Sequence, residues 1–432
     1  MTRVKHTNEI SNEDVDQEIV LYGWVHEPRD LGGLVFIILR DREGYAQVTL
    51  PKKVVDSELF KKARKMKRES VIAVKGVVKE ESKAPNGFEI IPSSLEVLNE
   101  AEGPLPLDVS EKVPAELETR LDHRYLDLRR LRVQAIFRIK HQMLKSTRDF
   151  LTEEGFVEIN TSKIVSTATE GGTELFPITY FEREAFLNQS PQLYKEALMA
   201  AGFEKVYEIA PIFRAEEHNT VRHLNEVNSM DIEASFMDHE DVMQVLERMV
   251  NRVYNDVAQN CQQYLKVFDK DLKIPELPFE RLKYVEAIDI AAKKGEEISW
   301  GEDLPTAALK LVAEEMPEHY FIVDWPTISK PFYAMPYEDD PELSKSFDLM
   351  YGALELASGA QRIHQYDLLV KRIKESGLNP ESFGFYLETF RYGMPPHSGW
   401  AVGAERFLMS MLGLKNIRET IMFPRDRNRL IP

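Results

Sequence analysis

The chain has a single cysteine among its 432 residues and no long uninterrupted apolar run. One cysteine, Cys261, excludes an internal disulfide framework and any metal site built from several thiolates. A membrane-spanning helix needs about 20 consecutive apolar residues, so an integral membrane protein is not expected. The polar N-terminus, MTRVKHTNEISNEDVDQE, is unlike a signal peptide. We therefore expect a cytoplasmic protein without a membrane partner, in which Cys261 is structural.

Positive charge is also scarce, because 55 Lys and Arg residues stand against 72 Asp and Glu residues, giving a net charge of −17. A protein that coats nucleic acid through bulk electrostatics would be basic, so this class is disfavoured, although local basic patches stay possible. The densest patch is KKARKMKR, residues 61–68. It is either a solvated helix face or a surface that attracts phosphates.

The N-terminal part of the chain has the pattern of a small β-barrel. Five strand-like segments lie between residues 18 and 99, with one helical stretch between the third and the fourth, at 18–26, 34–41, 45–50, 69–81 and 88–98. Gly-containing turn signals separate some of them. Five strands with such a helix fit an OB-type barrel, a fold that commonly binds single-stranded nucleic acid. A purely structural β domain is the alternative.

A charged segment punctuated by prolines follows at residues 104–132 and is expected to link an N-terminal domain, 1–103, to a larger domain, 133–432. Apolar residues recur at helical spacing from 136 to 151, and Gly155 could end that helix before the strand-like FVEIN. The larger domain is therefore expected to open with a long amphipathic helix that leads into a strand.

Two charged elements carry the strongest chemical signal in the larger domain. FRAEEHNTVRHLNE, residues 213–226, lies between two strand-like segments, and its basic side chains could neutralise phosphates. GAERF, residues 403–407, places an arginine beside small residues that let a flat ligand approach. Each arginine alone would usually be an ordinary surface residue. The two elements lie about 190 residues apart, in this order.

Together these elements resemble motifs 2 and 3 of the class II aminoacyl-tRNA synthetases. The resemblance narrows to the aspartyl-tRNA synthetases of archaeal type through four further segments: TATEGGTELF (167–176), QSPQLYK (189–195), SGAQR (358–362) and RYGMPPHSGWAVGAERF (391–407). It covers nearly the whole chain. It implies an α+β protein with an N-terminal OB-fold β-barrel that binds the anticodon, a class II catalytic domain on an antiparallel β-sheet flanked by helices, and a homodimer.

The resemblance implies that the larger domain binds ATP as a substrate. Arg214 would hold the α-phosphate, Glu216 would read the adenine amino group, and Arg406 would lie over the adenine ring. Arg222 and His223 would face the outgoing pyrophosphate. The positions that match the ATP-binding set of the family are Arg214, Glu216, Arg222, His223, Leu224, Glu355, Gly403 and Arg406.

Magnesium is the cofactor that the resemblance implies, held by Glu355 and Ser358, with Asp348 as a further acidic candidate. Mg²⁺ prefers hard oxygen ligands and is usually bound by one or two carboxylates together with substrate phosphates. The catalytic residues would be Arg214, Glu355 and Arg406, acting through positioning and charge stabilisation, so no general base is assigned.

The amino acid implied by the resemblance is L-aspartate. The positions that match its binding set are Glu170, Gln192, Lys195, Arg214, Asp231, Ser358 and Arg362. Lys195 and Arg362 would hold the side-chain carboxylate, and Glu170, Gln192 and Asp231 would surround the ammonium group. With asparagine, the two cations would lose their partner at a cost of roughly 2 to 5 kcal/mol. Asparaginyl-tRNA synthetases typically lack the lysine at position 195, so this residue favours aspartate.

In the N-terminal barrel, Phe36 matches a family position that stacks on an anticodon base, and Arg29 and Gln47 match positions that contact base edges. A stacked base contributes about 1 to 3 kcal/mol. Without the resemblance, Phe36 in LVFIIL would be assigned to the barrel core.

Two positions bear on which tRNA is charged, because the anticodons for aspartate and asparagine differ only in the last base, C or U. Archaeal-type enzymes that discriminate resemble one another in carrying Trp and Lys where this chain has His26 and Pro85. Proline offers neither an N–H donor nor a charge. The sequence therefore predicts aspartylation of both tRNA(Asp) and tRNA(Asn), with an amidotransferase converting the second product. Pro85 could otherwise be an ordinary turn residue.

The chain departs from the family pattern at three places. Ser162 stands where motif 1 normally ends in proline, which leaves the local geometry of the dimer open. Val227 and Asn228 stand where many relatives carry an aromatic residue over the adenine. In SGAQRIH, Ala360 and Ile363 replace the more usual glycine and glutamate.

Four alternatives stay open. The chain could charge tRNA(Asp) alone, it could be an asparaginyl-tRNA synthetase, it could be a tRNA-independent asparagine synthetase, or it could be a non-catalytic paralogue. The N-terminal barrel argues against the third alternative. The joint presence of Arg214, Glu355, Ser358 and Arg406 argues against the fourth.

Overall fold

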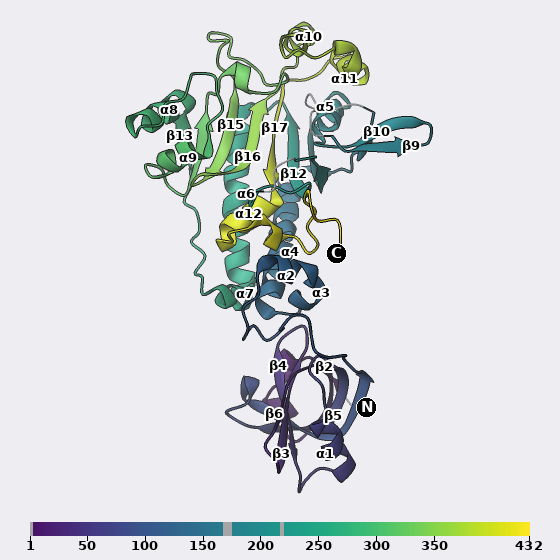
Figure 1. Ribbon diagram of the computed structural model, residues 1–432. Coiled ribbons are helices and arrows are strands. Elements are labelled where there is room, and N and C mark those ends of the chain that lie inside the picture. Colours follow the sequence, from purple (N-terminus) through teal and green to yellow (C-terminus); the bar gives the residue numbers. More distant parts are fainter. Residues whose placement is uncertain (1–2, 167–174, 217–219) are drawn as a thin grey trace. The chain divides into compact units, whose positions relative to one another are not determined.

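A computed structural model describes residues 3–166, 175–216 and 220–432 (Figure 1). The chain divides into two compact units, Met1–Leu131 and Arg132–Pro432. The expected finer division at residues 103 and 132 stays a prediction. Among the described residues, none of the helices combines the length and the apolar character needed to span a membrane. The expected cytoplasmic location also stays a prediction.

The first unit is a closed five-stranded barrel. Its elements are β2 (Glu18–Asp30), β3 (Leu34–Arg40), β4 (Tyr45–Pro51), α1 (Ser57–Arg64), β5 (Val71–Glu80) and β6 (Phe88–Asn99). The strand order is β2-β3-β4-β6-β5, and β5 pairs again with β2, which closes the barrel. Only β4 and β6 pair in parallel among these strands. The short β1 (Arg3–Val4) adds to β2. The prediction of an OB-type barrel is confirmed.

Alternating side chains explain both faces of this barrel. On β3, Val35, Ile37 and Leu39 are buried in the barrel core, whereas Phe36 between them is only half-buried and lies outside that core. Residues on one strand alternate between faces, so Phe36 points outward. The alternative that placed Phe36 in the core is therefore wrong. On α1 the lysines and arginines are exposed and Phe60 is buried, which is the pattern of a solvated helix face.

The segment expected to be a connector carries structure of its own. It contains α2 (Leu117–Asp122) and α3 (Arg124–Asp127), and its Leu107, Val109 and Leu126 form a small buried cluster. Asp127 is fully buried and pairs with Arg124. Residues 104–131 thus group with the barrel rather than forming a bare linker.

The second unit is built on an eight-stranded sheet in the order β13-β14-β15-β16-β17-β12-β11-β7. In that order the strands are Glu280–Lys283, His319–Val323, Ser346–Tyr351, Leu354–Gln361, His397–Gly403, Glu226–Ser235, Lys205–Phe213 and Val157–Glu158. All pairs are antiparallel except the two at the edges, β13 with β14 and β11 with β7. The predicted antiparallel α+β domain is confirmed.

Three helices cover one face of this sheet: α4 (Leu131–Glu153), α6 (His239–Asn260) and α12 (Ala404–Leu412). Figure 1 shows α4 and α6 running side by side against the sheet. Helix α4 is the predicted long helix, and Gly155, with φ +84°, supports the turn into β7. On β12, Met230, Ile232 and Ala234 pack into this core. The intervening residues of β12 therefore point to the opposite face, where the cavities lie.

The remaining helices are α5 (Gln192–Ala200), α7 (Gln262–Leu265), α8 (Tyr284–Lys293), α9 (Thr306–Ala313), α10 (Tyr366–Glu375) and α11 (Gly384–Arg391). Helices α5, α10 and α11 share a separate apolar cluster.

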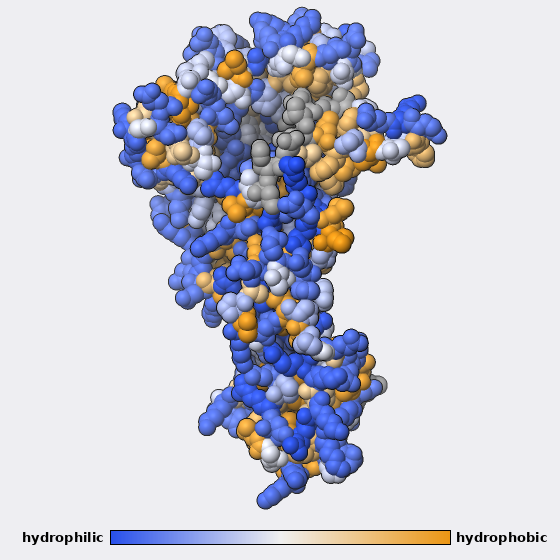
Figure 2. All heavy atoms as spheres, in the orientation of Figure 1, coloured by the Kyte–Doolittle hydropathy of each residue, from blue (hydrophilic) through white to orange (hydrophobic). Residues whose placement is uncertain are grey.

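A small sheet of β8 (Ile164–Val165), β10 (Arg183–Leu187) and β9 (Pro177–Tyr180) projects from the second unit. Ile164, Tyr180 and Phe181 are exposed there, and Figure 2 shows apolar residues gathered around this hairpin. Strand β7 is nearby in sequence, and both of its residues are exposed at the edge of the large sheet.

Candidate active site

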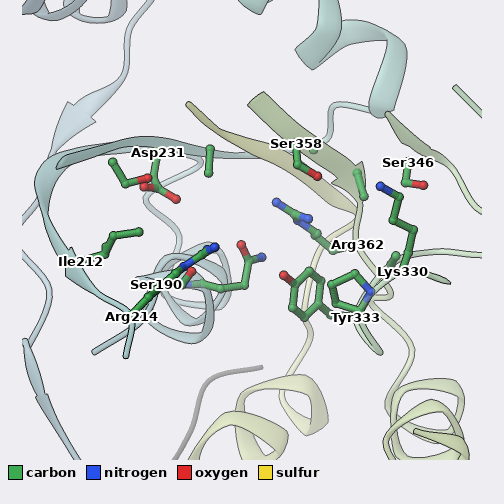
Figure 3. Close-up of a pocket in the computed structure, with 16 residues that line it drawn as sticks. Ser190, Ile212, Arg214, Asp231, Lys330, Tyr333, Ser346, Ser358 and Arg362 are labelled. Atoms are coloured by element: carbon green, nitrogen blue, oxygen red, sulfur yellow. The ribbon is translucent and has the colours of Figure 1, made fainter. Parts of the chain in front are cut away.

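A cavity of about 180 Å³ opens on the sheet face opposite to α4 and α6, between the sheet and α5. Five of the residues predicted to bind aspartate line it: Gln192, Arg214, Asp231, Ser358 and Arg362. Figure 3 shows Arg214, Asp231 and Arg362 converging on the same space from different elements. We refer to it as the amino-acid cavity.

A second cavity, of about 150 Å³, adjoins the first. It is lined by all eight residues predicted to bind ATP: Arg214, Glu216, Arg222, His223, Leu224, Glu355, Gly403 and Arg406. We refer to it as the nucleotide cavity. The two cavities share Arg214 and Ser358 in their walls. Arg214 therefore lies where a reacting group in one cavity would meet a phosphate in the other.

Arg214 is held at the junction by its backbone. Its N–H donates to the carbonyl of Asn225 at 2.9 Å, and Nδ2 of Asn225 donates to the Arg214 carbonyl at 2.8 Å. Asn225 also donates from Nδ2 to the carbonyl of Glu216 at 3.3 Å. These bonds clamp the two ends of the loop between β11 and β12. The sequence reasoning missed Asn225, because nothing in its sequence context distinguishes it from an ordinary loop amide.

Arg406 is fixed by a histidine and a carbonyl. It donates to Nε2 of His223 at 3.1 Å and to the carbonyl of Glu355 at 3.2 Å, while Nδ1 of His223 lies 2.7 Å from Oγ1 of Thr220. A guanidinium can only donate, so Nε2 of His223 accepts and the ring is neutral. Burial lowers the pKa of His223, and the charge of Arg406 lowers it further. The expectation that His223 faces the outgoing pyrophosphate stays a prediction, and in this structure its contact orients Arg406.

A β-bulge brings the predicted metal ligands to the cavity. Glu355 and Ser358 are three residues apart on β16, so a regular strand would point them to opposite faces. The pairing register with β15 shifts by one residue between Leu349 and Met350. This bulge lets both side chains face the nucleotide cavity, which they both line. Asp348 is the register partner of Ser358 on β15.

The donors at this place are hard oxygens. Asp348 receives a bond from Lys330 at 2.7 Å on Oδ2, whereas its buried Oδ1 has no hydrogen-bond partner among the described residues. Loss of hydration within the cleft and the charge of Asp348 raise the pKa of Glu355. A cation would relieve this repulsion. The described part of the chain holds no group of three or more His, Cys, Asp or Glu side chains arranged for a metal, so substrate oxygens would have to complete the set.

Lys330 is a further cavity residue that the sequence reasoning missed. Its Nζ lies 3.9 Å from the ring centroid of Trp325 while it donates to Asp348. It also lines the amino-acid cavity. Its segment, ISKPF, has no feature that marks it as part of a site.

A network of four charged groups forms the floor of the amino-acid cavity. Nζ of Lys195 donates to Oδ1 of Asp231 at 3.1 Å and lies 3.5 Å from Oε2 of Glu233. Nε of Arg362 donates to Oε1 of Glu233 at 3.1 Å. Lys195 lies beneath the cavity rather than in its wall, with 2% of its surface exposed. The expectation that both cations would lose their partner without aspartate is wrong, because Glu233 already pairs with both.

Glu233 was absent from the predicted set, although strand periodicity could have found it. It is two residues beyond Asp231 on β12 and therefore points to the same face. Glu170, by contrast, lies outside the described residues, so its predicted role stays a prediction.

The structure places the residues of two of the three departures from the family pattern. Val227 and Asn228 both line the nucleotide cavity. Asn228 donates from its backbone N and from Nδ2 to the carboxylate of Glu405, at 2.9 and 3.0 Å, which fixes its amide. Ala360 lies in the wall of the amino-acid cavity, and Ile363 is buried in the apolar cluster under α5, α10 and α11.

The predicted anticodon residues share the outer face of the barrel. Arg29 is the cross-strand partner of Phe36 on β2 and β3, and Gln47 follows on β4, half-buried like Phe36. Nε2 of Gln47 lies 3.3 Å from both Oγ1 of Thr49 and Oε2 of Glu89. The fold thus brings a ring and two polar side chains to neighbouring positions.

Contacts with Tyr45 are made by His26 and by Asn86, the residue that follows Pro85. The ring of His26 lies 4.9 Å from that of Tyr45, and Asn86, next to Pro85, lies 3.5 Å from the Tyr45 carbonyl. Arg40 faces Nδ1 of His26 at 3.3 Å. Burial lowers the pKa of His26, with a further contribution from the charge of Arg40, so the ring is neutral near pH 7.

Comparison with known families matches both units. The family described as tRNA synthetases class II (D, K and N) matches residues 116–427, and the OB-fold nucleic acid binding domain matches residues 19–98. A protein named Aspartate--tRNA(Asp/Asn) ligase from Archaeoglobus fulgidus is 71% identical over 427 residues, which cover 99% of each chain. A protein of the same name from Methanocaldococcus jannaschii is 57% identical and covers 100% of this chain and 98% of its own.

Solved structures share the whole fold. The asparaginyl-tRNA synthetase from Pyrococcus horikoshii complexed with asparaginyl-adenylate has a TM-score of 0.95 and 35% identity, with 100% of both chains covered. The aspartyl tRNA synthetase from Entamoeba histolytica has a TM-score of 0.89 and 32% identity, covering 100% of this chain and 93% of its own. The same fold thus occurs in proteins named for either amino acid.

The charge balance of the cavity floor gives a stability prediction. Replacing Glu233 by glutamine leaves Lys195 and Arg362 without their shared carboxylate, and breaking a buried ion pair costs about 3 to 5 kcal/mol. We expect Glu233→Gln to lower the free energy of unfolding by an amount of this order, measured by urea denaturation without ligands. The control is Glu388→Gln, on the exposed face of α11. Equal stability of the two variants would show that Glu233 does not balance the cations.

Proposed function

Because the chain belongs to the class II tRNA synthetases of the D, K and N group, we propose that it joins L-aspartate to tRNA at the expense of ATP. The observation that carries the proposal is the pair of adjoining cavities with Arg214 at their junction. One cavity holds the charged groups suited to an amino acid with a second carboxylate, and the other collects every residue predicted to bind ATP.

The reaction proceeds in two steps. The α-carboxylate of aspartate attacks the α-phosphorus of ATP, which forms aspartyl-adenylate and expels pyrophosphate. A hydroxyl of the terminal ribose of tRNA then attacks the activated carbonyl carbon and expels AMP, and the hydroxyl proton passes to a phosphate oxygen of the adenylate. Arg214 stabilises the negative charge that develops on the α-phosphate, and Arg406, oriented by His223, holds the nucleotide. Fixed cations and positioned substrates account for the catalysis, so no side chain need act as a general base.

The acidic residues of β15 and β16 fit a magnesium ion. Glu355, Ser358 and Asp348 would hold it through oxygen atoms, with the ATP phosphates as further ligands. When bound, such an ion neutralises phosphate charge. The buried Oδ1 of Asp348, which lacks a hydrogen-bond partner among the described residues, supports this assignment.

Aspartate is preferred to asparagine in this proposal, although the fold itself does not decide between them. The argument comes from Lys195 and Arg362 and from relatives of 57–71% identity named Aspartate--tRNA(Asp/Asn) ligase. A carboxylate that enters next to these cations gains charge-assisted hydrogen bonds that a neutral amide cannot match.

The tRNA partners in this proposal are tRNA(Asp) and tRNA(Asn). Phe36 would stack on an anticodon base while Arg29 and Gln47 contact base edges. His26 and Pro85 occupy the positions where a discriminating enzyme would carry Trp and Lys. A neutral histidine and a proline give little means to separate C from U. Aspartyl-tRNA(Asn) would then require an amidotransferase.

The assembly in this proposal is a homodimer. Support comes from the exposed edge strand β7 and from the exposed apolar residues near it, including Val157, Ile164 and Phe181. An open edge strand presents unpaired backbone groups that a second copy can use, and burying the apolar side chains would stabilise the contact.

The first prediction from this proposal concerns activity. Purified protein is expected to catalyse aspartate-dependent exchange of pyrophosphate into ATP and to charge both tRNA(Asp) and tRNA(Asn) transcripts with labelled aspartate. Arg214→Ala is expected to lower the exchange rate by about 10²–10³, as for loss of one charge-stabilising donor.

Each alternative has its own outcome in these assays. Charging of tRNA(Asp) alone would identify a discriminating enzyme. Exchange driven by asparagine would identify an asparaginyl-tRNA synthetase, and free asparagine formed without tRNA would identify an asparagine synthetase. Absence of all these activities would leave a non-catalytic paralogue.

The second prediction concerns tRNA choice. The double variant His26→Trp with Pro85→Lys is expected to lower kcat/KM for tRNA(Asn) about ten-fold or more while sparing tRNA(Asp), since one base-edge contact is worth about 1 to 3 kcal/mol. Lys79→Ala, an exposed change elsewhere on the barrel, serves as control. An unchanged ratio of the two kcat/KM values would remove positions 26 and 85 from anticodon reading.

The third prediction concerns assembly. Sedimentation velocity is expected to give twice the mass of one chain, and Val157→Asp with Ile164→Asp is expected to halve it. Trp300→Asp is the matched control, because Trp300 and Val157 are both 47% exposed. A monomeric wild-type protein at micromolar concentration would refute the dimer.

A further inference from the structure

The side-chain amide nitrogen of Gln192 donates a hydrogen bond to a buried carboxylate. It lies at the start of α5 in the wall of the amino-acid cavity, and its Nε2 donates to Oε1 of Glu196 at 2.6 Å. Glu196 is one helical turn further along α5 and has no exposed surface. The bond therefore forms inside the protein, behind the cavity wall.

Glu196 is itself held from the other side. Its Oε2 accepts from the hydroxyl of Tyr386 at 2.8 Å and lies 3.1 Å from Nε2 of His397. Nδ1 of His397 lies 2.8 Å from the carbonyl of Pro395, which can only accept, so this nitrogen carries a proton. Two elements distant in sequence from α5 thus fix the carboxylate.

The two groups stabilise each other's charge. Burial alone would raise the pKa of Glu196, but the hydrogen bond and charge of His397, the charge of Arg362 and the hydrogen bond from Gln192 together outweigh it and leave the pKa below its ordinary value. Burial alone would lower the pKa of His397, but the hydrogen bond and charge of Glu196, with smaller contributions from Glu233 and the Pro395 carbonyl, raise it above its ordinary value. Glu196 is therefore an ionised carboxylate, which accepts hydrogen bonds and donates none.

This fixes the orientation of the Gln192 amide. Because Glu196 can only accept, Gln192 must turn its NH₂ group toward it, which leaves Oε1 for the cavity. Asp231 lines the same cavity, and its buried Oδ2 has no hydrogen-bond partner among the described residues. Two oxygen acceptors on one wall suit a ligand group that only donates, such as an ammonium.

We propose that Glu196, fixed by His397 and Tyr386, is a positioning residue. It holds the Gln192 side chain with Oε1 facing the amino-acid cavity, so that Gln192 and Asp231 together bind the α-ammonium group of the substrate. The inference rests on the proposed function in taking the ligand of this cavity to be an amino acid. It adds a buried set of hydrogen bonds, centred on Glu196, that selects for the amino group of the substrate. This set is separate from the cations that face the substrate carboxylates.

The test compares ligands with and without an ammonium group. In Glu196→Gln the new amide can donate to Oε1 of Gln192 and turn its NH₂ toward the cavity. We expect the KM for aspartate in pyrophosphate exchange to rise roughly ten-fold to a hundred-fold. The inhibition constants of succinate and L-malate, which carry hydrogen or hydroxyl in place of the ammonium, are expected to change less than about two-fold.

A reciprocal exchange sharpens the test. In Gln192→Glu with Glu196→Gln the amide at 196 donates to the carboxylate at 192, which again presents an oxygen to the cavity. We expect this double variant to recover most of the lost affinity for aspartate. Glu247→Gln, a buried change on α6 outside both cavities, is the control for loss of a buried carboxylate.

Several results would overturn the proposal. A parallel rise of the KM for aspartate and of both inhibition constants in Glu196→Gln would indicate general distortion of the cavity. Failure of the reciprocal variant to recover affinity for aspartate would reject the orientation in which Oε1 of Gln192 faces the cavity. If Glu196→Gln does not fold, Gln192→Met removes the acceptor directly, and an unchanged KM for aspartate would be equally decisive. Lack of exchange by the wild-type protein would instead reject the proposed function.

Discussion

Glu233 balances two cations beneath the amino-acid cavity, and the central strands are arranged around that balance. Lys195 and Arg362 are almost completely buried, so each needs a counter-charge within the protein. Strand β17 passes closely over the Glu233 carboxylate at Gly399, where a Cβ atom would come within 2.4 Å of Oε2. A glycine is therefore required at this position, which is the register partner of Glu233. The two cavities open on the sheet face opposite to α4 and α6.

This balance changes how selection of aspartate is understood. Asp231 and Glu233 carry two negative charges against the two positive charges of Lys195 and Arg362. Neither Lys195 nor Arg362 is therefore an unpaired positive site, because each already has a carboxylate partner within the protein. The amino group of the substrate would face a different wall of the amino-acid cavity, where Glu196 orients the side-chain amide of Gln192.

The two units use guanidinium groups in the same way. Arg406 donates to His223 in the nucleotide cavity, and Arg40 faces His26 on the barrel, each at hydrogen-bond distance from a ring nitrogen. A guanidinium only donates, so each histidine accepts and stays neutral. Arg40 is in turn held by Glu69 through two hydrogen bonds. In both places the histidine ring accepts a hydrogen bond from the guanidinium and contributes no positive charge.

The sequence by itself determined the elements and most of the chemistry. Alternating and helical apolar patterns predicted the barrel strands and α4, because such periodicity depends on local burial alone. The eight residues predicted from the motifs to bind ATP all line the nucleotide cavity. Only the tertiary structure decided which polar groups pair: Glu233, Lys330, Asn225 and Glu196 act through partners 11 to more than 200 residues away. Their roles follow from hydrogen-bond direction and burial, which depend on contacts between distant segments and leave no local pattern in the sequence.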